Sequence, residues 1–115
     1  MEVEGRTIKE LIKKIIFEMN RMVKCEGASE NFTTKFEVKG KDMKEAMENF
    51  IKKIIDYFEK ENVIFEYMEI EIVPSKKWIL KCSLIGRSFE KVKKDFREIK
   101  IFNLEESLNG WKAVI

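Results

Sequence analysis

The residues of this chain that could do chemistry are its lysines and carboxylates, because its 115 residues include no histidine and only two cysteines. Without histidine, the sequence excludes a Ser-His-Asp or Cys-His nucleophile, a histidine base near neutral pH and a His-ligated zinc or copper site. Two cysteines are too few for a four-thiolate metal site. Cys25 and Cys82 are far apart in the sequence, so we expect reduced structural thiols and no disulfide framework.

One basic stretch is the main candidate for a contact surface. It comprises Lys91, Lys93, Lys94, Arg97 and Lys100, with Phe89, Phe96 and Phe102 nearby in the sequence. Basic side chains among aromatic rings can bind single-stranded RNA, because the rings stack on bases and the cations contact phosphates. Acidic residues are interleaved with these cations and oppose their field (Glu90, Asp95 and Glu98). The stretch is therefore either an RNA or partner contact or, as we prefer for a charge run alone, a solvated loop anchored by phenylalanines.

Carboxylates gather in two further regions of the sequence. They are Glu66, Glu69 and Glu71 in one predicted strand region, and Glu105 and Glu106 beside a predicted hairpin. Clustered carboxylates can hold Ca²⁺ or Mg²⁺ through their oxygens. The sequence has no D-x-[DN]-x-[DN]-G calcium loop, so the preferred interpretation is a polar sheet face whose carboxylates have lysine partners on neighbouring strands.

Two amphipathic helices are predicted to position these residues. Thr7 and Glu10 form a capping box, and the apolar residues that follow at steps of three and four predict a helix over residues 8–23. Asp42 and Glu45 form a second cap signature and predict a helix over residues 43–61. Methionines at helical spacing are interpreted as core residues, with a flexible partner groove as the alternative; they are Met19, Met22, Met43 and Met47.

Alternating apolar positions predict the strands that pack on these helices. We expect strands over residues 1–5, 32–38, 63–73, 78–86 and 98–106, with a bulge between Tyr67 and Met68. Residues 25–31 are predicted to be a loop, and residues 87–96 a long loop or a short irregular helix. Asn109 and Gly110 predict a hairpin that pairs Leu108 with Trp111, Glu106 with Ala113 and Leu104 with Ile115. Trp78 and Trp111 are interpreted as core or rim aromatics.

These elements follow the order β-α-β-α-β-β-β-β and predict one α+β domain over residues 1–115. In it, two antiparallel amphipathic helices pack against mostly antiparallel β-sheet layers. The formal net charge of +2 is far from the basic excess of a protein that depends on phosphate contacts. No signal peptide, membrane span or phosphate-binding glycine loop is present, so we expect a cytoplasmic protein without membrane contact. Abundant Lys, Glu and Ile without Gln resemble a thermophile composition.

Five segments, taken in their order, carry a resemblance to a known family. They are residues 5–11 (GRTIKEL), 38–45 (VKGKDMKE), 50–58 (FIKKIIDYF), 63–72 (VIF followed by MEIEI) and 110–115 (GWKAVI). They are similar, in turn, to the capped first helix, the strand and turn before the second helix, the core of that helix, the next strand and the closing strand of the archease family. The chain thus resembles an archease over nearly its whole length.

The resemblance implies a helix pair packed with β-sheet layers and a non-catalytic helper of the GTP-dependent tRNA-splicing RNA ligase. Family members promote guanylylation and turnover of that ligase with a divalent ion, typically Ca²⁺, and have been regarded as chaperones or modulators. The ligase and tRNA would then be partners. The alternative is a module that binds RNA or protein without a link to the ligase. A small enzyme that uses carboxylates and lysines ranks third.

The sequence departs from the family pattern at the residues that bind the metal. Archeases usually begin with a D-H-T-A-D segment and end with an Asp after the closing strand, and these ends provide the metal-binding acids. Neither occurs in this sequence, and Asn103 stands in the region of the family's T-Y-H. No metal ligand is therefore transferred to any residue, and we expect weak or no Ca²⁺ binding. Two explanations stay open. Either the reading frame begins too late and ends too early, or the protein is a reduced paralogue without the metal site.

Overall fold

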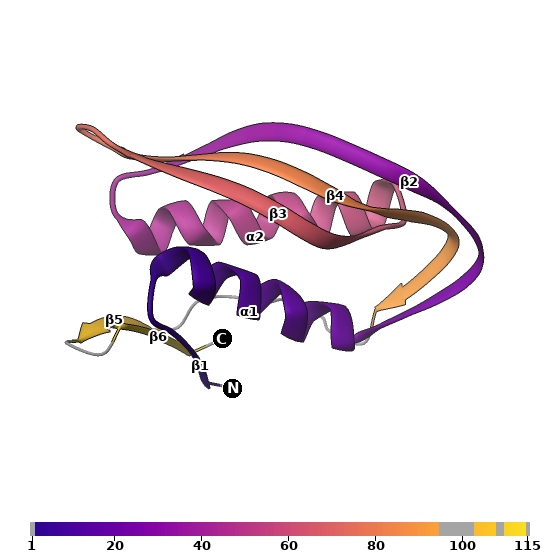
Figure 1. The fold of residues 1–115 in the computed structure, drawn as a ribbon, viewed down its shortest axis with the longest axis horizontal. Coiled ribbons are helices and arrows are strands. Elements are labelled where there is room, and N and C mark those ends of the chain that lie inside the picture. The colour runs from indigo at the N-terminus through magenta and orange to yellow at the C-terminus, as the bar shows by residue number, and fades with distance from the viewer. Residues whose placement is uncertain (1, 95–102, 108–109, 115) are drawn as a thin grey trace.

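Two helices and two three-stranded antiparallel sheets form the fold of the computed structural model, which describes residues 2–94, 103–107 and 110–114 (Figure 1). The elements are β1 (Glu2–Gly5), α1 (Ile8–Arg21), β2 (Val23–Gly40), α2 (Met43–Lys60), β3 (Val63–Pro74), β4 (Trp78–Lys94), β5 (Asn103–Ser107) and β6 (Gly110–Val114). One sheet has the strand order β1-β6-β5 and the other β2-β4-β3. The α+β class and the predicted order of elements are confirmed.

Both helices begin where their predicted caps place them. The Oγ1 of Thr7 accepts a hydrogen bond from the backbone N–H of Glu10 at 3.1 Å, and the Oδ1 of Asp42 accepts one from that of Glu45 at 2.8 Å. Each cap satisfies a backbone donor that has no partner within the helix. The helices end at Arg21 and Lys60, within two residues of the predicted ends.

The core lies between the helices and the inner face of the β2-β4-β3 sheet. The apolar faces of α1 and α2 are buried, and Phe65, Leu80 and Leu84 cover them from the sheet side. The second sheet packs on α1, which contacts β1 and β6 as well as β3 (Figure 1). Met19, Met43 and Met47 are buried, which confirms their interpretation as core residues; Met22 is half-buried. Trp111 packs partly buried against the core, and Trp78 lies at the rim.

Two predictions are wrong, the loop at residues 25–31 and the long loop or short irregular helix at residues 87–96, because residues 25–31 and 87–94 belong to strands. β2 and β4 pair from Gly40 opposite Trp78 to Val23 opposite Lys94, with a register shift between Glu26 and Ser29. Beyond Val63, the first residue of β3, only β2 and β4 remain paired, and residues 23–29 and 89–94 form this two-stranded extension. The β2 side of the extension is mostly exposed, so its sequence shows no alternation of apolar and polar residues. Residues 95 and 96 lie outside the described part. The predicted bulge in β3 is present, one residue early, between Phe65 and Tyr67.

The predicted register of the final hairpin is also wrong, by two residues. The ladder pairs Ser107 with Gly110, Glu106 with Trp111 and Leu104 with Ala113. A shift of two residues keeps every side chain on the same face of the sheet, so the alternation of apolar residues fits both registers. Gly110 adopts a φ of +129°, and a Cβ there would lie 2.7 Å from the Cα of Arg6. The predicted strand segment 98–102 and the pairs with Leu108 and Ile115 lie outside the described residues.

Candidate functional site

The structure places the first three residues of the basic stretch, Lys91, Lys93 and Lys94, on the two-stranded extension of β2 and β4. In the ladder, Lys91 lies opposite Glu26, Lys93 opposite Lys24 and Lys94 opposite Val23. Arg97 and Lys100 lie outside the described residues. Lys24 was not singled out from the sequence, because only strand pairing brings it to Lys93.

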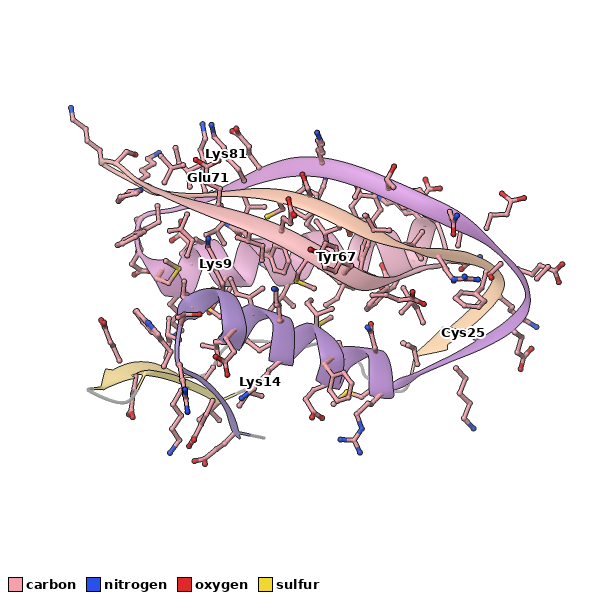
Figure 2. All side chains as sticks on the ribbon, viewed as in Figure 1. Lys9, Lys14, Cys25, Tyr67, Glu71 and Lys81 are labelled. Atoms are coloured by element: carbon pink, nitrogen blue, oxygen red, sulfur yellow. The ribbon has the colours of Figure 1, made fainter. Side chains whose placement is uncertain are left out.

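The carboxylates of β3 lie on a polar sheet face, as the preferred interpretation predicts. Glu71 pairs with Lys81 in the ladder, and the Nζ of Lys81 lies 4.0 Å from Oε1 of Glu37 (Figure 2). Glu66, at the bulge, lies 3.9 Å from the Nε of Arg87. These are exposed cross-strand ion pairs, which stabilise a sheet weakly.

A lysine stands among the carboxylates of the second sheet. The Nζ of Lys112 lies 3.1 Å from Oε1 of Glu2, and the ladder places Glu4 and Glu105 on either side of Lys112. The hydrogen bond and charge of Glu2, with weaker effects of the other two carboxylates, raise the pKa of Lys112. Within the described ranges, no three His, Cys, Asp or Glu side chains gather in a way that could hold a metal ion.

Both cysteines are free thiols, as the sequence predicts, but their surroundings differ: Cys82 is buried and Cys25 is exposed. Burial raises the pKa of Cys82 to about 12, whereas Cys25 is exposed and desolvation raises its pKa less. We expect a chromogenic disulfide reagent to titrate the Cys25 thiol rapidly in the folded protein and the Cys82 thiol only after unfolding. The variant Cys25→Ser should lose the rapid phase, and rapid reaction of both thiols in the folded protein would contradict the burial of Cys82.

The raised pKa of Cys82 has a consequence for stability at high pH. In the unfolded chain the thiol of Cys82 ionises at about pH 8.5. In the folded protein it keeps its proton until the pH approaches its raised pKa of about 12. Above about pH 8.5 the unfolded state binds fewer protons than the folded state, so the free energy of unfolding falls as the pH rises. Cys82→Ala should remove this component of the pH dependence in denaturant titrations.

Sequence reasoning also missed a groove between α1 and β3. Phe17 on α1 is 62% exposed and Tyr67 on β3 is 55% exposed, and both line a depression of about 170 Å³. A larger depression of about 710 Å³ spans β2, β4 and β3 and reaches Lys9 and Lys13 of α1. The sequence does contain a signal for this groove, because each element has an apolar residue outside its buried face. Phe17 is not part of the buried face of α1, and Tyr67 directly follows the bulge residue Glu66 of β3.

Comparison with known proteins adds the family to this geometry. No helix among the described residues is long and apolar enough to cross a membrane. A search of curated proteins found no match. The family model of the Archease protein family matches residues 1–114, which is essentially the whole chain. The chain belongs to the archease family.

Proposed function

We propose that this protein is a non-catalytic accessory protein that promotes a GTP-dependent tRNA-splicing RNA ligase. The observation that carries the proposal is the family match over residues 1–114. Archease family members are non-catalytic accessory proteins associated with tRNA splicing, and the order of the helices and strands agrees with that expected from the resemblance. The exposed groove between α1 and β3 supports the same proposal, since an accessory protein needs a contact surface more than an acid–base centre.

We further propose that this chain acts without a Ca²⁺ ion of its own. The support is the acidic corner of the second sheet, where the ammonium of Lys112 stands beside Glu2 and between the ladder positions of Glu4 and Glu105. A lysine already supplies positive charge there, and it repels a divalent ion at close range.

The test is the GTP-dependent turnover of the purified ligase on cleaved tRNA, with increasing amounts of this protein. We expect multiple turnovers to rise with its concentration and to saturate, equally with added Ca²⁺ and with a calcium chelator. The variant Lys52→Glu reverses one exposed charge on α2, outside the groove between α1 and β3, and should stimulate the ligase like the unchanged protein. No change in turnover at saturating protein contradicts the accessory role. Stimulation only with Ca²⁺ contradicts the metal independence alone.

A second candidate function is RNA binding on the extension of β2 and β4. The specific observation is that the ladder sets Lys93 opposite Lys24, so that two lysine positions from distant parts of the sequence meet on one strand pair; a polyanion binds where lysines gather. Binding of tRNA that weakens steeply with salt, and that Lys93→Glu with Lys94→Glu abolishes, would favour this function. No detectable affinity for RNA at low salt would remove it.

A further inference from the structure

β3 is an edge strand of the main sheet. The strand order β2-β4-β3 leaves one side of its 12-residue backbone hydrogen-bonded to β4, and no described strand lies on the other side. Unpaired N–H and C=O groups along such an edge can pair with an extended segment of another chain. β2 forms the opposite edge, but none of the large exposed hydrophobic residues found in the described part lies on β2. The β3 edge is therefore the better candidate for strand addition.

Aromatic side chains flank this edge at the C-terminal end of α1. Phe17 and Tyr67 come from different elements, are each more than half exposed, and line the same depression of about 170 Å³. Single exposed apolar residues are ordinary on protein surfaces, whereas apolar side chains gathered around one depression are typical of interaction sites. We call the surface formed by Lys9, Lys13, Phe17 and Asn20 of α1 together with residues 65–71 of β3 the α1–β3 seam.

Asn20 leaves a buried acceptor unmatched in the seam. Its Nδ2 donates a hydrogen bond to the backbone carbonyl of Phe65 at 2.7 Å, which sets the orientation of the side-chain amide. Its Oδ1 is buried and has no hydrogen-bond partner among the described residues. Buried polar atoms are almost always paired, so this oxygen is a ready acceptor for an N–H group brought to the edge of β3.

Positive charge continues the seam toward the N-terminus of α1. Lys9, Lys13 and Phe17 follow one another at steps of four, so they lie along one side of the helix. The two depressions share Lys13, Tyr67 and Met68 and are therefore continuous. Lys14 pairs with Glu10 at 3.2 Å, whereas neither Lys9 nor Lys13 forms an ion pair with a described residue. Figure 2 shows Lys9 and Tyr67 along the line where α1 meets β3.

We infer that the α1–β3 seam receives an extended segment of a protein partner, which adds a strand to the edge of β3. The segment carries an apolar side chain against Phe17 and Tyr67 and an acidic side chain against Lys13 or Lys9. The four-residue step from Lys13 to Phe17 rises about 6 Å along the helix axis. This rise matches the length of two strand residues at about 3.3 Å each. The partner motif is therefore an apolar and an acidic residue separated by one position, and both then point to the same side of the added strand.

The acidic residues of β3 argue for a protein occupant over a nucleic acid. Glu66, Glu69 and Glu71 are exposed along the strand and would repel a phosphate backbone, even though Lys81 and Arg87 offset part of their charge. Main-chain hydrogen bonds to an edge strand are likewise a property of peptides. The inference rests on the proposed function, in which the partner is the RNA ligase.

The test compares ligase binding and ligase stimulation by two seam variants and two controls. The seam variants are Phe17→Ala with Tyr67→Ala, and Lys9→Glu with Lys13→Glu. Their controls are Trp78→Ala, which removes a partly exposed aromatic side chain at the start of β4, opposite Gly40 and Pro74, and Lys44→Glu with Lys52→Glu on α2. We expect each seam variant to weaken ligase binding by at least about tenfold and each control to bind like the unchanged protein. Amide hydrogen exchange of β3 should slow in the complex.

The possible failures are distinguishable. Seam variants that bind and stimulate like the unchanged protein overturn the seam and leave the proposed function standing. Equal loss from Ile85→Ala, which removes the side chain opposite Tyr67 on the outer sheet face, without slower exchange in β3, overturns strand addition, because docking then uses that face. Binding of tRNA that the seam variants abolish, without ligase binding, overturns the assignment to a protein partner. An unchanged protein that neither binds nor stimulates the ligase overturns the proposed function and the seam with it.

Discussion

Phe65→Ala is expected to lower the free energy of unfolding by about 3–5 kcal/mol. Phe65 is fully buried on β3, with its ring edge-on to Tyr57 at 5.4 Å between centroids and tilted toward Phe32 at 6.3 Å. Its neighbours belong to β2 and α2, so the truncation leaves a cavity where the sheet meets the helices. A helix and a strand cannot close such a cavity without breaking their own hydrogen bonds. Urea denaturation followed by circular dichroism measures the change.

Phe17→Ala is the matched control for this truncation. It removes the same atoms from a side chain that is 62% exposed, so the change in stability should stay within about 0.5 kcal/mol. A loss for Phe65→Ala no larger than that of Phe17→Ala would contradict the position of Phe65 in the core. The control also serves the seam experiment, because a folded Phe17→Ala protein that loses ligase binding has lost a contact and not its fold.

Gly86→Ala is expected to destabilise the protein by about 1–3 kcal/mol through overpacking. Gly86 lies in β4 with Phe65 opposite it on β3 and Phe32 opposite it on β2. A Cβ on Gly86 would lie 2.8 Å from the Cα of Phe65 and closer still to the carbonyl oxygen of Ile64. Both are backbone atoms, which cannot rotate away, so the strands would have to move apart beside the bulge of β3. Denaturant titration and faster amide exchange in β3 are the readouts.

Ser83→Ala is the control in the same strand. Ser83 lies in β4 opposite Lys35 on β2 and Glu69 on β3, and it already carries a Cβ, so alanine adds no atom there. Its replacement by alanine should change stability by no more than about 0.5 kcal/mol. A Gly86→Ala protein as stable as Ser83→Ala would show that β3 and β4 can separate at the bulge at little cost.

Local patterns predicted the helices well, because the information for a helix lies within a few residues. Thr7 and Asp42 stand at the caps, and the steps of three and four behind them select the faces that become buried. The same reasoning predicted the strands that have one face on the core, including the bulge of β3 within one residue. It also predicted the methionines of the helices as core residues, which holds for Met19, Met43 and Met47.

Strand pairing was harder to predict, because a pairing partner is distant in the sequence. The extension of β2 and β4 has little apolar pattern, and its backbone is ordered by hydrogen bonds between segments such as residues 23–26 and 91–94. The final hairpin obeys the predicted alternation but takes a register two residues away, which alternation cannot distinguish. The pairing of Lys24 with Lys93 and the surroundings of Lys112 follow from these ladders alone.

Residue types and short-range patterns were sufficient to predict the class of the fold, the buried faces of its helices, the family, and the exclusion of every histidine-dependent site. These properties depend on residue types and on periods shorter than one element. Which side chains meet at the surface follows from the three-dimensional packing. Phe17, Asn20 and Tyr67 converge at the α1–β3 seam because α1 packs beneath an edge strand that begins more than 40 residues later. That meeting depends on long-range packing and on strand order, which no local pattern encodes.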